Sequence, residues 1–211
     1  MRIALCLVAL VCAAPHAAAQ DMIEWSGEKR LSIADFKGRV PVNTATTSLS
    51  WLNIDATWEC EAGELFATVR ATFDPSRSWW RSASANIWEG VGDRTGGVSR
   101  THIDARRGVV QRDMQLLEHE QLHFDLTEIA VRKIRKRFDD TKGACAEPGG
   151  TEEFQHVVAQ ADRELQDEQR EYDRETRHGT NAAAQDQWRR KIRQQLDLAP
   201  RPQTTTPPRR R

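Results

Sequence analysis

Two histidines and a glutamate in the middle of the chain have the spacing of a metal site. The segment Leu116–Asp125 reads LLEHEQLHFD, in which His119 and His123 are four residues apart and Glu120 directly follows the first histidine. On an α-helix, four residues advance by about 400°, so both imidazoles stand on one face, one turn apart. Imidazoles in this arrangement can share a zinc ion, and the neighbouring carboxylate can take a proton from a metal-bound water. The segment therefore predicts a zinc-dependent hydrolytic site with Glu120 as the general base.

A catalytic zinc site needs a third protein ligand and one open position. The tenth residue after His119, where some zinc proteases carry that ligand, is Ile129. The third ligand is therefore expected from a second helix that folds back against the first. The candidates on that helix are His178, Asp173 and Glu168. Counting residues from the turn between the two helices does not choose among them.

Tyr172 is the only tyrosine of the chain and lies in the same predicted helix as the candidate third ligands. Its hydroxyl could donate a hydrogen bond to the oxyanion of a tetrahedral intermediate, as a catalytic residue. Alternatively, its ring could cover the contact between the two helices. The sequence leaves both roles open.

The elements that must position this site fall into two regions. Before about residue 110 the sequence favours β-structure, and the segment Glu64–Phe73 alternates most regularly. Thr46–Trp58 alternates partially, and Val98–Ile103 is predicted as a further short strand after Gly96-Gly97.

After Gly108 the apolar spacing becomes helical. It predicts a helix over Val110–Phe138 and a second over Thr151–His178, with Thr151 as N-cap and Gly179 as the stop. A last helix is expected over Asn181–Leu198. The predicted fold is α+β: a small β-sheet packed on the helix that carries the histidine pair, then a helical hairpin and a C-terminal helix.

The N-terminus has the pattern of a secretory signal peptide over residues 1–19. Arg2 precedes the apolar run Ile3–Ala14, and Ala17-Ala18-Ala19 is a small-residue cleavage site. A run of about twelve apolar residues is too short for a membrane span, which needs ~20. We expect cleavage after about Ala19, a secreted or periplasmic protein without stable membrane insertion, one domain over residues 20–198, and a disordered tail over residues 199–211.

Cysteine use and charge limit the remaining possibilities. After removal of the signal, the chain keeps Cys60 and Cys145, which in an oxidising compartment allow one disulfide. It would close a loop of about 85 residues and add about 4 kcal/mol of stability in the chain-entropy model. The 31 basic residues balance the 31 acidic ones, so net charge gives no reason to expect nucleic acid as a partner.

Several motifs together resemble a known family. They are Asp35-Phe36-Lys37-Gly38, Phe73-Asp74 before Ser78-Trp79, the segment Leu117–Asp125, and Tyr172-Asp173 before Thr176 and His178-Gly179. In these features the chain resembles a bacterial family of predicted secreted zinc-dependent proteases, long catalogued as a domain of unknown function. The resemblance implies a zincin-like metallopeptidase with bound Zn²⁺ and a peptide or protein substrate. It also implies His178 as the third zinc ligand.

The expected function is that of an exported zinc metallopeptidase, in which a zinc-bound water attacks the peptide carbonyl with Glu120 as base. The alternative is a zinc-binding envelope protein without turnover that acts as a binding or assembly module. Glu120 favours the enzyme, because a purely structural site needs ligands but no base.

Overall fold

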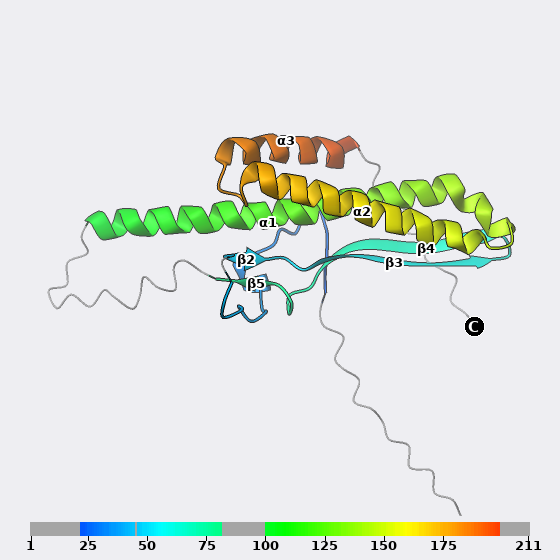
Figure 1. Cartoon of the computed structure of the whole chain (residues 1–211), viewed down its shortest axis with the longest axis horizontal. Coiled ribbons are helices and arrows are strands. Elements are labelled where there is room, and N and C mark those ends of the chain that lie inside the picture. Colours follow the sequence, from blue (N-terminus) through cyan, green and yellow to red (C-terminus); the bar gives the residue numbers. More distant parts are fainter. Residues whose placement is uncertain (1–21, 45, 82–99, 199–211) are drawn as a thin grey trace, which may run out of the picture.

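The computed structural model describes residues 22–44, 46–81 and 100–198. Within these ranges the fold is α+β, as predicted, with small antiparallel sheets on one side and three α-helices. Helix α1 spans Arg100–Thr141, α2 spans Gly150–Thr176 and α3 spans Ala182–Leu198. The first two form the predicted hairpin, and α3 packs on the opposite side of it from the long strands (Figure 1).

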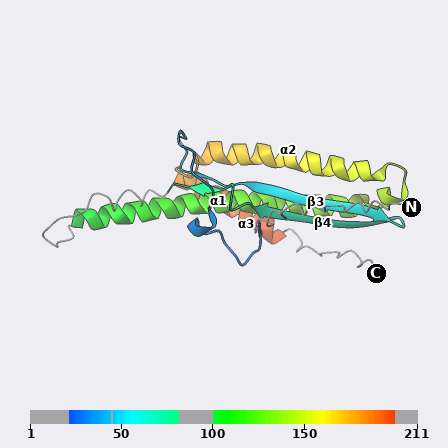
Figure 2. The ribbon, with the colours of Figure 1, turned by 90° about the horizontal axis from the view of Figure 1, so that it is seen from below.

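The larger sheet has three antiparallel strands in the order β1-β4-β3. They are β1 (Ile23–Glu24), β4 (Glu64–Phe73) and β3 (Leu52–Glu61). β4 has the bounds that its alternating sequence predicts, and its partner β3 pairs with it from Leu52↔Phe73 to Glu61↔Glu64. Both strands run along the C-terminal part of α1 (Figures 1 and 2).

The predicted strand Thr46–Trp58 is divided in the structure. Its first part is β2 (Ser48–Leu49), which pairs with β5 (Trp79–Trp80) in a separate two-stranded sheet, and its second part belongs to β3. The division falls at Trp51, whose backbone N–H donates to the Ser78 hydroxyl at 2.8 Å instead of to a neighbouring strand.

The predicted short strand Val98–Ile103 is wrong in the part that the structure describes. Arg100–Ile103 form the first turn of α1, and residues 98–99 lie outside the described ranges. No proline separates Ile103 from the periodic segment that follows. Gly108, after which the helix was predicted to begin, lies inside α1, where it costs about 1 kcal/mol relative to alanine without ending the helix. The predicted signal peptide and C-terminal tail also lie outside the described residues.

The middle of α1 is buried on two sides. One side packs against the inner face of β4 and against α2 in a cluster that includes Phe73, Phe124, Ile134, Phe138 and Phe154. The other side packs against α2 and α3 in a second cluster, with Leu126, Leu165, Tyr172, Trp188 and Ile192. Because both sides are covered, polar side chains on this stretch of α1 lie in a largely dry environment. Among the described helices, none has both the length and the apolar character needed to cross a membrane.

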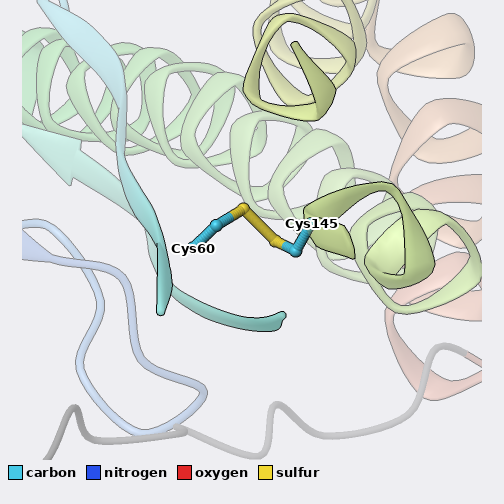
Figure 3. Close-up of a disulfide and its surroundings, with 2 residues drawn as sticks. All are labelled: Cys60 and Cys145. Atoms are coloured by element: carbon cyan, nitrogen blue, oxygen red, sulfur yellow. A yellow bond between two sulfur atoms is a disulfide. The ribbon is translucent and has the colours of Figure 1, made fainter. Parts of the chain in front are cut away.

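The predicted disulfide is present. Cys60 near the end of β3 bonds to Cys145 in the short 3₁₀ helix η3 (Lys142–Ala146), which forms the turn between α1 and α2 (Figure 3). The bond joins residues 85 positions apart, so it ties the sheet to the helical hairpin at the turn.

Candidate metal centre

Helices α1 and α2 bring three potential ligand atoms together. The Nε2 atoms of His119 and His123 lie 3.1 Å apart, and Asp173 Oδ1 lies 3.0 Å from the first and 2.9 Å from the second. The two histidine side chains are 3% and 10% exposed, whereas that of Asp173 is 31% exposed. The group is therefore buried on the α1 side and open to solvent on the α2 side. Within the described residues, His119, His123 and Asp173 thus form a group of three side chains that could hold a metal ion.

The dimensions of this triangle fit a small divalent ion. Donors bound at about 2.0–2.2 Å to one tetrahedral zinc ion lie about 3.4 Å from each other. The observed separations of 2.9–3.1 Å are a few tenths of an ångström shorter. Two imidazole nitrogens and one carboxylate oxygen are also a donor set that zinc accepts. The residues present thus fit zinc in both donor type and spacing.

The opposite nitrogen of each ring faces a glutamine. His123 Nδ1 lies 2.5 Å from Gln169 Oε1, and His119 Nδ1 lies 3.4 Å from Gln185 Oε1. An amide oxygen can only accept a hydrogen bond, so each Nδ1 must carry the proton that is donated to it. When the ring is neutral, each Nε2 then has a lone pair that faces Asp173, and when the ring is protonated, each Nε2 donates to the Asp173 carboxylate.

Burial and the neighbouring charges shift the pKa values of His123 and Asp173 in opposite directions. Burial lowers the pKa of His123, but the hydrogen bond to Asp173 and the negative charges of Glu120 and Asp173 outweigh it, so the pKa is raised. Burial raises the pKa of Asp173, but the hydrogen bonds to His119 and His123 outweigh it and hold the pKa well below its usual range. The carboxylate is therefore ionised and available as a ligand.

Glu120 is buried beside the triangle and held from the β2 side. Ser48 Oγ donates to Glu120 Oε1, and Ser50 Oγ donates to Oε2, each at 2.5 Å. A carboxylate has about four acceptor positions, so two hydroxyl donors leave room for a further donor such as water. Ser48 and Ser50 point the same way because they alternate along an extended chain.

The N-terminal motifs of the chain position these serines. Gly38 donates its backbone N–H to Ser78 O at 2.7 Å, so closely that a Cβ at Gly38 would lie 2.7 Å from that oxygen. Ser78 is fully buried and its hydroxyl binds the backbone of Trp51, the residue after Ser50. Phe36 packs edge-on against Phe73 and Trp80. The motifs therefore fix the course of β2 over Glu120.

Tyr172 lies behind the triangle, with no exposed surface. Its ring stacks on His119 at 4.7 Å and meets His123 edge-on at 4.8 Å, and its hydroxyl donates to Gln185 Oε1 at 2.9 Å. Burial raises the pKa of this hydroxyl. In this position Tyr172 supports the imidazoles and fills the contact between the helices, while its catalytic role stays a prediction.

His178 stands at the rim of the site. Its Nδ1 lies 3.4 Å from Asp173 Oδ1, and its side chain is 74% exposed. It follows α2 in a left-handed turn, because Arg177, His178 and Gly179 have φ values of +50°, +51° and +78°. Of the two other candidate third ligands, Asp173 occupies the triangle, and Glu168 instead forms ion pairs with Lys133 and Lys191.

The sequence interpretation did not include the two serines or the two glutamines. One signal was available for Gln169, which precedes Asp173 by four residues and so shares its face of α2. Another was available for Gln185, which lies at helical spacing with Trp188 and Ile192 on the buried side of α3. Nothing local in the sequence indicated that Ser48 and Ser50 reach Glu120, 70 or more residues away.

Comparison with protein families covers the central part of the chain. Residues 104–179 match the family described as "Bacterial protein of unknown function (DUF922)". The matched segment contains all three residues of the triangle, Glu120 and the left-handed turn, and it ends before α3. Neither the curated proteins nor the solved structures gave a match.

Proposed function

We propose that the protein is a zinc-dependent hydrolase that cleaves peptide bonds, with His119, His123 and Asp173 holding the ion. Asp173 replaces His178 as the third ligand in this proposal, because its carboxylate oxygen already lies about 3 Å from both Nε2 atoms. His178 is placed to contact whatever approaches from solvent.

One observation carries the proposal: the two Nε2 atoms and the Asp173 oxygen lie within 3.1 Å of one another, and with the Nδ1 protons directed at the glutamines neither neutral ring has a proton on Nε2 to place between them. Both Nδ1 atoms direct their protons at glutamine oxygens, so the facing Nε2 atoms and the Asp173 oxygen would repel each other without a positive charge between them. Buried acceptors in this arrangement need a cation or additional protons. A bound zinc ion supplies that charge and acts as a Lewis acid that polarises a carbonyl group and activates water.

Glu120 is proposed as the proton-accepting group. Its carboxylate is fixed by Ser48 and Ser50, so it cannot turn away from the site, and its charge is close enough to His123 to raise the pKa of that ring. A positioned carboxylate of this kind can take a proton from water and return it to the leaving amine.

A groove beside the site supports an extended peptide as the substrate. It has a volume of about 390 Å³ and lies between β3 and α2. Ile54, Trp58 and Val158 give it apolar walls, and Gln169, the partner of His123, lies at one end. Within the described ranges β3 is hydrogen-bonded to β4 only, and we propose that an extended substrate would add along the opposite edge of β3 by β-augmentation.

Export is proposed on two grounds. The first 19 residues have the composition of a signal peptide, and the disulfide between Cys60 and Cys145 is expected in an oxidising compartment.

A second function, zinc binding without turnover, has one observation in its favour. Both oxygens of Glu120 already accept short hydrogen bonds from serines, so the carboxylate has a structural role that ties the β2 segment to α1 whether or not it transfers protons. Such a site could serve a binding or assembly module that needs only the ligands.

Metal analysis and one substitution test these functions together. The purified domain should contain about one zinc per chain, which His119→Ala should remove. Glu120→Gln should retain the zinc and abolish cleavage of a peptide library that the wild-type protein cleaves. Zinc retained by a wild-type protein that cleaves nothing would support the second function, and a wild-type protein that binds no zinc would overturn both.

A further inference from the structure

We propose that Gln169 and Gln185 are the positioning residues of the metal centre, and that α3 is part of the centre through Gln185. Each glutamine would hold one ligand imidazole in the tautomer that has its proton on Nδ1 and its lone pair on Nε2. The inference rests on the proposed zinc site, but its structural content, the position of the Nδ1 protons, is measurable without zinc.

The orientation of the Gln169 amide is fixed by its second contact. Gln169 Nε2 donates to Thr127 Oγ1 at 3.3 Å, and the Thr127 hydroxyl in turn donates to the His123 carbonyl at 3.0 Å. Thr127 has no exposed surface, and its only proton is used in that bond, so it must accept from the amide NH₂. The amide oxygen therefore faces His123 Nδ1, which must donate to it.

The orientation of the Gln185 amide is fixed by Tyr172. The buried tyrosine hydroxyl needs an acceptor for its proton, and Gln185 Oε1 lies 2.9 Å away, closer than the alternative His119 carbonyl at 3.4 Å. The same Oε1 is the atom that faces His119 Nδ1. Gln185 Nε2 is buried without a partner among the described residues. A buried amide group without a partner is energetically unfavourable, and turning the amide around would place Nε2 against His119 Nδ1 and reverse the tautomer of that ring.

The neutral charge of both partners has a chemical consequence. Where the second partner of a metal-bound histidine is a carboxylate, it raises the basicity of the imidazole. A glutamine oxygen also raises the basicity of the imidazole, but by less than a carboxylate does, because it carries no negative charge. Zinc would therefore keep more of its positive charge than with two aspartates in these places, while the only anionic ligand is Asp173.

Gln185 lies on α3, outside the segment that matches the family. The family match ends at residue 179, before this helix begins at Ala182. α3 is held against the site by Trp188, whose ring lies 5.3 Å from that of Tyr172 and whose Nε1 donates to Glu175 on α2 at 2.7 Å. A residue from outside the matched segment thus orients a ligand within it.

The test combines imidazole ¹⁵N NMR of the ion-free protein with zinc affinity measured by competition with a chromophoric chelator. In the wild-type protein, both His119 and His123 should carry a proton on Nδ1. Gln185→Leu should convert His119 to the tautomer with the proton on Nε2, donated to Asp173, and raise the Kd for zinc by about 10- to 100-fold. Gln185→Glu keeps the acceptor, so it should keep the Nδ1 proton and bind zinc at least as tightly as the wild type.

Gln187→Leu is the matched control, because Gln187 is exposed on the same helix. It should change neither measurement. If Gln185→Leu does not fold, Gln185→Met offers a closer match in shape without the amide acceptor. The inference is overturned if His119 lacks the Nδ1 proton in the wild type, or if folded Leu or Met variants leave both tautomer and Kd unchanged. A wild-type protein that has both Nδ1 protons but binds no zinc would instead overturn the proposed function and leave the positioning role standing.

Discussion

The backbone of Gly179 packs directly against the imidazole of His119. A Cβ at Gly179 would lie 3.0 Å from His119 Cβ and 3.1 Å from its Cγ, closer than side-chain contacts normally come. The residue also has a φ of +78° and ends a left-handed turn that includes Arg177 and His178. Non-glycine residues in this conformation are unfavourable by about 1–2 kcal/mol each, so the turn is held by its surroundings. The close contact and the turn together place His178 at the rim of the metal centre and Gly179 against the His119 ring.

Gly179→Ala should therefore weaken both the fold and the metal centre. The added methyl group is unfavourable at this φ and pushes on His119, so the free energy of unfolding should fall by about 1–3 kcal/mol and the Kd for zinc should rise. Urea unfolding and zinc titration measure the two effects. Gly143→Ala is the control, because nothing lies within 4 Å of its Cβ position and the residue is exposed. Equal zinc affinity in both variants would contradict the role given to the contact.

Asp173→Asn and His178→Ala distinguish the two possible third ligands. If Asp173 is the ligand, loss of its charge should raise the Kd for zinc at least 100-fold, because an amide oxygen is a much weaker zinc ligand than a carboxylate. His178→Ala should then change the Kd less than about 10-fold, since that ring is 74% exposed and only borders the triangle. Competition with a chelator measures both constants. The opposite ranking would restore His178 as the third ligand, the role that the resemblance implied.

The sequence predicted the architecture well wherever the signal was local. The alternation of β4, the two longer helices after residue 110 and the pairing of Cys60 with Cys145 all depend on periodicity or on a simple count. The start of α1 was missed because a strand-like composition around Ile103 outweighed the helical continuation. The division between β2 and β3 was missed because it depends on Ser78, a residue 27 positions away from Trp51.

Within the site too, the sequence predicted what local spacing determines and missed what contacts between distant segments determine. The His119/His123 pair is visible because helical spacing alone brings the rings together. The approach of Asp173 to both rings depends on the register between two helices, which a count from the turn does not fix closely enough to choose Asp173 over His178. The serines that hold Glu120 depend on the path of β2, which is set by contacts among Gly38, Ser78 and Trp51.

The hydrogen bond between Ser48 and Glu120 should appear as a coupling energy in a double-mutant cycle. Ser48 is buried and donates to an ionised carboxylate, a type of bond worth about 1.5–3 kcal/mol. Ser48→Ala should therefore destabilise the wild-type protein by about that amount and the Glu120→Ala variant by much less. Urea unfolding of the four proteins measures the coupling. Equal effects of Ser48→Ala in both backgrounds would show that the hydroxyl does not act through Glu120.

Replacement of Cys60 and Cys145 together by alanine should lower stability while sparing the metal centre. The disulfide closes a loop across 85 positions, so its loss should reduce the free energy of unfolding by about 4 kcal/mol in the chain-entropy model. The turn that holds Cys145 lies about 27 Å along α1 from His123, at 1.5 Å per residue, so the Kd for zinc should change less than about 3-fold in the folded variant. Reduction of the wild-type protein with dithiothreitol should reproduce the loss of stability, and the same treatment of the double variant should have no effect. A large loss of zinc affinity in the folded double variant would show that the register between α1 and α2 at the site depends on the distant disulfide.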